Sequence, residues 1–212
     1  MSVAGNLKSL LEAIPQGVKL VAVSKFKPEE DILAAYAAGQ RRFGENRPLE
    51  MEAKAKDLPA DIEWHFIGHL QTNKIKNVIP YASLIESVDS LHLLEAIDAA
   101  AARAGRVVDC LLEVHVAAEQ SKGGFTEEEA VAVAADAGRY PNIRLRGIMA
   151  MATNTDDAET VRSDFRRARQ VQQATGLKEL SMGLSGDYPL AIAEGATIVR
   201  VGTAIFGGRN YR

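Results

Sequence analysis

The segment Lys19–Gly39 reads KLVAVSKFKPEEDILAAYAAG and contains one complete strand-and-helix unit. Its first residues, Lys19–Ser24, are apolar and rich in valine, which is typical of a short buried strand. Pro28 and the acidic residues after it favour the first turn of a helix, and Gly39 is typical of a helix end. The segment therefore predicts a strand followed by a helix over Pro28–Ala38, which is the repeating unit of parallel α/β folds.

The same unit recurs along the whole chain. The other predicted strands are Arg42–Glu45, Trp64–Ile67, Leu84–Val88, Asp109–Val116, Leu145–Ala150, Glu179–Met182 and Thr197–Val201. The other predicted helices include Leu91–Ala104, Glu127–Ala137 and Ala158–Thr175. Thr126 has the chemistry of a helix N-cap, and Gly105, Gly176 and Gly195 are placed to end helices. Eight strands alternating with helices predict a closed (β/α)8 TIM-type barrel, and an open doubly wound sheet is the alternative.

Length and composition suit one soluble domain. A chain of 212 residues with 47% apolar residues can bury a single core, and no Pro-, Gly- or Ser-rich linker divides it, so we expect one domain over residues 1–212. The net charge of -3 gives no general attraction to nucleic acid or to an anionic membrane. No signal peptide or membrane-spanning apolar run is present, so we expect a cytoplasmic protein. Cys110 is the one cysteine, and its apolar surroundings predict a buried side chain.

The barrel prediction also indicates where chemistry should lie. Active sites of such barrels lie at the C-terminal ends of the strands, and phosphate sites favour the loops after strands seven and eight. Lys25 directly follows the first predicted strand, where its amine can form a Schiff base with an aldehyde. The alternative for Lys25 is a surface lysine that closes a strand. Lys27 precedes a proline at a helix start, and we expect it to be a solvated neighbour.

Small and hydroxyl-bearing residues follow the last two predicted strands. The first of these loops contains Ser185, and the second contains Gly202 and Thr203. Such residues let backbone N–H groups approach a phosphate closely, although glycines can also serve only to permit tight turns. Arg200 lies on the last strand itself and can contact a ring nitrogen of a cofactor or serve as a structural ion-pair partner.

Other predicted strand ends are polar too. Asn46 follows the second strand, while His65 and His69 lie on and after the third. We interpret the two histidines as core or mouth-lining residues, because no acidic or cysteine partners cluster near them in sequence to complete a metal site. Lys122 follows the fifth strand, and it is either a second basic group at the mouth or an exposed loop lysine.

With these residues assembled, the sequence resembles the pyridoxal phosphate homeostasis protein family over essentially its whole length. The shared motifs are VAVSKFKP (21–28), FGENR (43–47), WHFIGHLQTNK (64–74), SKGGF (121–125), GIMAM (147–151), SMGLSGD (181–187) and VRVGTAIFGGR (199–209). Each motif alone is weak, and together they are specific.

The resemblance implies a barrel like the N-terminal domain of alanine racemase, with pyridoxal 5′-phosphate held as an internal aldimine. Lys25 matches the family's Schiff-base lysine. Ser185, Gly202 and Thr203 match its phosphate cradle, and Arg200 matches the position near the pyridine ring. Asn46 and His65 are implied as neighbours of the cofactor, and Lys122 as an accessory residue for its release or secondary binding.

Three functions are compatible with these residues. The first is a non-catalytic binding protein for pyridoxal phosphate in vitamin B6 homeostasis, acting as a monomer that buffers the cofactor or supplies it to apo-enzymes, with no catalytic residue assigned. The second is a pyridoxal phosphate-dependent amino-acid racemase-like enzyme. Racemisation needs two bases on opposite faces of the substrate, and racemases of this fold take one from an additional domain. The third is a binding protein for another phosphorylated ligand. We expect the first.

Overall fold

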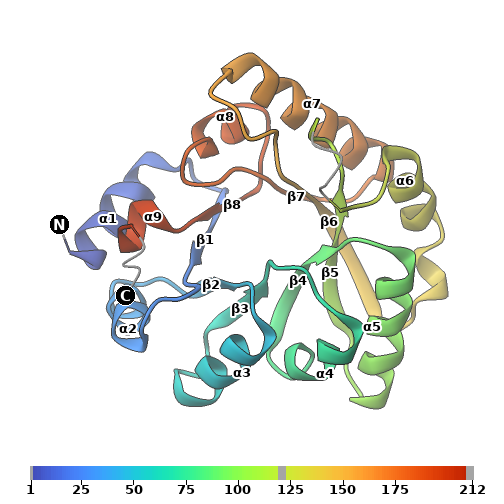
Figure 1. Ribbon diagram of the computed structural model, residues 1–212, viewed down its shortest axis with the longest axis horizontal. Coiled ribbons are helices and arrows are strands. Elements are labelled where there is room, and N and C mark those ends of the chain that lie inside the picture. The colour runs from blue at the N-terminus through green and yellow to red at the C-terminus, as the bar shows by residue number, and fades with distance from the viewer. Residues whose placement is uncertain (1, 119–122, 209–212) are drawn as a thin grey trace.

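The computed structural model describes residues 2–118 and 123–208, and its strands form a closed barrel (Figure 1). All eight strands are parallel and follow one another around the ring in chain order, with the first and last also paired. They are β1 (Lys19–Val23), β2 (Arg42–Glu45), β3 (Glu63–Phe66), β4 (Ala82–Val88), β5 (Val108–Val114), β6 (Ile143–Ala150), β7 (Glu179–Ser181) and β8 (Ile198–Val201).

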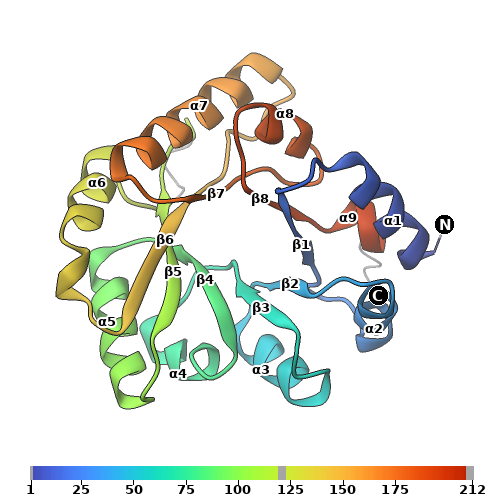
Figure 2. The same cartoon turned by 180° about the vertical axis from the view of Figure 1, so that it is seen from behind.

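The helices lie outside the ring of strands, as both faces of the barrel show (Figures 1 and 2). They are α1 (Val3–Ala13), α2 (Glu29–Ala37), α3 (Pro48–Asp57), α4 (Ile75–Val78), α5 (Leu91–Arg103), α6 (Glu127–Ala135), α7 (Ala158–Thr175), α8 (Tyr188–Ala193) and α9 (Thr203–Phe206). Two 3₁₀ turns, Thr72–Lys74 and Ala137–Arg139, complete the described elements. The first and last helices pack together, and Asn6 Nδ2 donates to the carbonyl of Ile205 over 2.9 Å.

The core has two parts, because a barrel strand buries both of its faces. The larger part fills the layer between the strands and the helices around them. A smaller cluster fills the inside of the barrel, with Val21, Leu84, Leu111, Met149 and Ile198 almost completely buried. This inner cluster occupies the inside of the barrel between the two ends of the strands.

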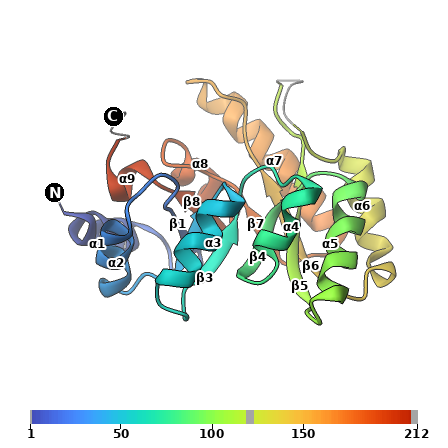
Figure 3. The same ribbon diagram turned by 60° about the horizontal axis from the view of Figure 1, so that its bottom comes forward.

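Alternate side chains of β1 lie on the inner face of the barrel, from one end of the strand to the mouth. Successive residues of a strand point to opposite faces, so Lys19, Val21, Val23 and Lys25 share one side. Val21 belongs to the inner cluster, and Val23 lines a pocket at the C-terminal ends of the strands. This register places Lys25 at the mouth and Lys19 at the opposite end (Figure 3 shows the barrel from the side).

The predicted closed barrel is confirmed, and the open-sheet alternative is wrong, because β1 pairs with β8. The glycines expected at helix ends have positive φ values: 100° at Gly39, 60° at Gly105, 69° at Gly176 and 100° at Gly195. Thr126 caps α6 in a capping box with Glu129. Cys110 is completely buried, as expected.

Within residues 2–118 and 123–208, no helix combines the length and the apolar character needed to cross a membrane. The same residues contain no cluster of three or more His, Cys, Asp or Glu side chains suited to a metal ion.

Candidate functional site

A pocket of about 240 Å³ opens at the C-terminal ends of β1, β7 and β8. It brings together five of the residues singled out in the sequence: Lys25, Ser185, Arg200, Gly202 and Thr203. These residues lie up to 178 positions apart in the chain, so their convergence is a property of the closed barrel. An amine, hydroxyls and a guanidinium facing one cavity suit a small anionic ligand that carries an electrophilic carbon.

The loop after β1 is held in an unusual backbone conformation beside Lys25. Phe26 has a φ of 61°, a left-handed value that is uncommon for a residue other than glycine. Its N–H donates to Glu50 Oε1 over 2.7 Å, and the Arg47 guanidinium lies 4.4 Å above its ring. These contacts stabilise the turn that directs the chain away from β1 directly after the lysine.

The buried ion pair between Lys54 and Glu45 contacts the same loop. Lys54 Nζ donates to the carbonyl of Ser24, to Glu45 Oε1 and to Glu50 Oε1, over 2.9, 2.8 and 2.8 Å. The Ser24 hydroxyl also donates to Glu45. Burial raises the pKa of Glu45 above its ordinary value, and the nearby Lys54 opposes that rise. Lys54 has no role that the sequence predicts, because its pattern is that of an ordinary exposed helical lysine.

The loops after β7 and β8 are joined directly. Gly202 N donates to Ser185 Oγ over 3.1 Å, which fixes the two loops relative to each other at the pocket wall. A Cβ atom at Gly202 would lie 3.1 Å from the carbonyl oxygen of Val23. Glycine at this position therefore lets the β8 loop approach β1, beside Lys25.

Arg200 forms the floor of the pocket and is only 2% exposed. Its Nη1 donates to Ser181 Oγ over 2.6 Å and its Nη2 to the carbonyl of Ala150 over 3.1 Å. Nη1 also lies 3.5 Å from Oε2 of Glu86, a completely buried carboxylate. Both roles considered for Arg200 are thus compatible with the structure: it is an ion-pair partner, and it lines the pocket.

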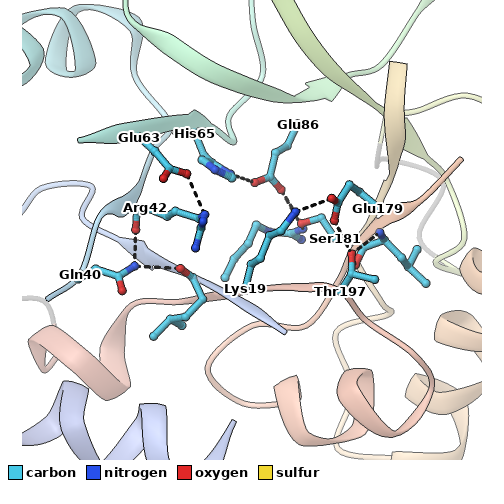
Figure 4. Close-up of polar contacts among 12 residues, drawn as sticks. Lys19, Gln40, Arg42, Glu63, His65, Glu86, Glu179, Ser181 and Thr197 are labelled. Atoms are coloured by element: carbon cyan, nitrogen blue, oxygen red, sulfur yellow. Dashed lines mark hydrogen bonds and ion pairs between the residues drawn. The ribbon is translucent and has the colours of Figure 1, made fainter. Parts of the chain in front are cut away.

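Of the other predicted site residues, His65 and Asn46 are not among those that line this pocket. His65 lines a separate cavity of about 140 Å³ at the N-terminal ends of the strands, where its Nδ1 lies 2.6 Å from Glu86 Oε1 (Figure 4). Asn46 follows β2, and its buried side-chain oxygen accepts no hydrogen bond from the described residues. Lys122 lies outside the described residues.

The structure gives Lys27 more contacts than the solvated side chain that the sequence predicted. Its Nζ donates to the carbonyls of Phe206, Gly207 and Gly208 over 3.0 to 3.2 Å, and its side chain lines the pocket. The carbonyls that end α9 carry partial negative charge, so a lysine is a favourable partner for them. The long sequence separation between Lys27 and these carbonyls hides this contact from the sequence.

A second acidic side chain, Glu113 on β5, lies near Arg200 at the mouth of the barrel. Burial, together with the charge of Asp89, raises the pKa of Glu113 to about 7, while Arg200 and His69 act in the opposite direction. Nothing in the sequence distinguished Glu113 from any other strand-end carboxylate. It gives the mouth a group that changes charge near neutral pH.

The Glu113 carboxyl should make stability depend on pH in a defined direction. Its pKa rises from an ordinary value of 4.5 to about 7 on folding, so the folded chain keeps a proton that the unfolded chain has released. The free energy of unfolding therefore falls as pH rises from 4.5 to about 7, by up to about 3 kcal/mol from this group. Glutamine does not titrate, so Glu113→Gln escapes this loss. The free energy of unfolding of Glu113→Gln minus that of the parent should therefore be larger at pH 8 than at pH 5 by about this amount, as measured by urea denaturation.

Glu12→Gln on α1 provides the control, because it removes the same chemical group from an exposed position. A Glu113→Gln variant whose stability difference from the parent is the same at pH 5 and pH 8 would contradict the expected shift.

Comparison with known proteins agrees with this geometry. The family described as "Alanine racemase, N-terminal domain" matches residues 2–210. A protein of Vibrio alginolyticus named "Pyridoxal phosphate homeostasis protein" is 39% identical over 207 residues, which cover 93% of this chain and 89% of the relative.

Two solved structures extend the comparison. The structure of PipY from Synechococcus elongatus PCC7942 "with PLP bound" is 38% identical, with a TM-score of 0.88, and the match covers 97% of this chain and all of PipY. An alanine racemase of Clostridium difficile 630 has a TM-score of 0.81 at 14% identity, and the match covers 57% of that enzyme. The racemase shares the fold of this chain, which corresponds to a little over half of the racemase.

Proposed function

This chain belongs to the alanine racemase N-terminal domain family, and from that membership we propose that it binds pyridoxal 5′-phosphate in the Lys25 pocket and serves in the homeostasis of that cofactor. The observation that carries the proposal is the convergence of Lys25 with Ser185, Gly202, Thr203 and Arg200 on one cavity. The name of the Vibrio relative and the bound PLP in PipY support the same assignment.

The residues of the pocket fit the parts of this cofactor. When bound, pyridoxal phosphate supplies an aldehyde, a phosphate and a pyridine ring. Lys25 would hold the cofactor covalently, because a primary amine condenses with an aldehyde with loss of water, and the cofactor would supply that aldehyde. The Ser185 hydroxyl and the small residues Gly202 and Thr203 suit the phosphate, because they let donors approach it closely. Arg200 supplies a permanent positive charge beside the ring.

We propose that the protein is a binding protein without a catalytic residue. The pocket opens to solvent, which favours loading and release of the cofactor over chemistry that needs water to be excluded. In this proposal the whole chain is one cytoplasmic, monomeric domain, and cofactor-dependent apo-enzymes are the recipients. Amino-acid racemisation by the purified protein at more than about 1 per second, an ordinary enzyme rate, would contradict it.

Three residues have a supporting place in the proposal. Asn46 lies beside the loop after β3, where a Cβ atom at Gly68 would come within 2.7 Å of the Asn46 Cα, so this part of the mouth is tightly packed. His65 is linked to Arg200, which lines the pocket, through Glu86 and Ser181. Lys122 remains a predicted accessory residue for cofactor release.

Lys25→Ala should abolish the visible absorption band that added pyridoxal phosphate produces in the parent protein. The band comes from the carbon–nitrogen double bond, which needs a primary amine. Reduction with borohydride followed by peptide mass analysis should place the cofactor on Lys25 in the parent.

Two lysine variants complete the design. Lys8→Ala removes an exposed lysine of α1 and should keep the band, and Lys27→Ala should keep the band while weakening the loop after α9. An unchanged band in Lys25→Ala would move the attachment to another lysine. A parent protein without any band would overturn the assignment of the cofactor.

A further inference from the structure

A chain of buried polar side chains crosses the barrel behind Arg200. His65 Nδ1 lies 2.6 Å from Glu86 Oε1, Ser181 Oγ donates to Glu86 Oε2, and Arg200 Nη1 donates to Ser181 Oγ over 2.6 Å. Figure 4 shows the part of this chain from His65 through Glu86 to Ser181. The side chains of His65, Glu86 and Arg200 are 5%, 0% and 2% exposed. The four residues come from β3, β4, β7 and β8 and meet inside the barrel.

Glu86 is the charged centre of this chain. A buried carboxylate is unstable unless cations and hydrogen-bond donors face it. Burial alone would raise the pKa of Glu86, but His65 and Arg200 hold that pKa below its ordinary value, so the group remains ionised. Each of its oxygens has a defined partner, His65 for one and Ser181 for the other. The carboxylate is therefore fixed in position as well as in charge.

The same contacts determine where the Arg200 guanidinium lies. A guanidinium offers five donors and no acceptor, so its orientation follows the acceptors around it. Three acceptors contact the Arg200 guanidinium, and none of their residues lines the pocket: the Ser181 hydroxyl, the Ala150 carbonyl and the Glu86 carboxylate. Of these, the Glu86 carboxylate carries a full charge, and charge-assisted contacts are the stronger ones.

We propose that Glu86 is the positioning residue of the site, anchored by His65, and that it fixes Arg200 in the pocket floor and sets the charge that a bound pyridine ring meets. This inference rests on the proposed binding of pyridoxal phosphate. It assigns to Glu86 an effect on the ligand without contact between the two, because Glu86 does not line the pocket and its partner Arg200 does. It also gives His65 a role that does not require it to line the pocket.

The test compares Glu86→Gln with the parent protein by titration with pyridoxal phosphate, followed through the absorption spectrum. Glutamine keeps the shape and an acceptor oxygen but removes the charge, so Arg200 loses its ionic partner. We expect the band to form, with its maximum displaced and with a dissociation constant about tenfold higher, in line with the loss of one charged hydrogen-bonding partner. Ser181→Ala removes the hydroxyl between Glu86 and Arg200 and should shift the band in the same direction.

Asp98→Asn is the matched control. Asp98 on α5 accepts from the backbone N–H of Asn142, and neither residue lines the pocket. Loss of this hydrogen bond should lower stability and leave the spectrum and the dissociation constant unchanged. If Glu86→Gln matches the parent in both readouts, Glu86 has no positioning role, although cofactor binding at Lys25 stands. If Glu86→Gln does not fold, Ser181→Ala decides: a parent-like spectrum there overturns the inference. A parent without a band overturns the binding proposal itself.

Discussion

Replacement of Gly147 by alanine is expected to lower the free energy of unfolding by about 3 kcal/mol. A Cβ atom at this position would overlap the backbone of Glu179 on the neighbouring strand, lying 2.7 Å from its Cα and closer still to its carbonyl group. Backbone cannot move aside as a flexible side chain can, so β6 and β7 would have to separate. Urea denaturation of the parent and the variant measures the difference.

The cause of this close approach is a bulge in β6. Cys110 pairs with Leu145 and the next residue, Leu111, pairs with Gly147, so Arg146 is an extra residue in the ladder. Gly138 provides the control, because nothing lies within 4 Å of a Cβ atom there and its φ is not positive. Gly138→Ala should change stability by less than about 1 kcal/mol. Equal effects of the two substitutions would show that β7 accommodates the additional methyl group.

Replacement of Arg200 by methionine should cost about 3 to 5 kcal/mol of stability, because it leaves the Glu86 carboxylate buried without its guanidinium partner. Methionine fills a similar volume, so the loss reports mainly on charge. The double variant Arg200→Met with Glu86→Gln should be more stable than Arg200→Met alone, since it no longer contains the buried charge. A double-mutant cycle in denaturant gives the interaction free energy of the pair.

An exposed ion pair serves as the reference for this cycle. Arg166 on α7 contacts Glu159 and Glu194 at the surface, and Arg166→Met should cost no more than about 1 kcal/mol. An Arg200→Met variant as mild as Arg166→Met would mean that Glu86 takes up a proton or finds water when its partner is lost.

Much of the barrel follows from local pattern. The bounds of β2 and α7 are those predicted, because short apolar runs and helix caps are properties of neighbouring residues. The predicted strand Leu145–Ala150 begins two residues late, since the observed β6 starts at Ile143 and contains the bulge. A bulge depends on the partner strand, which local pattern does not describe.

The residues of the pocket were also predicted in part from the sequence. Lys25 and Arg200 were predicted from their places after the first strand and on the last strand, together with the known position of barrel active sites, and both line the pocket. Glu86, Ser181 and Lys54 were not predicted as parts of the site. Glu86 and Ser181 lie in strands whose other residues are ordinary core, and their partners are 19 to 114 positions away.

The pairing of β1 with β8 has a consequence for how the protein is made. Ribosomes release the chain from its N-terminus, so Lys25 emerges long before Ser185 and Gly202, the opposite wall of its pocket. The ring can close only when residues 198–206 are available to pair with β1 and to pack against α1. Such long-range closure is slow and comes late in folding. A nascent chain therefore exposes Lys25 without the pocket around it until β8 has been synthesised and has paired with β1.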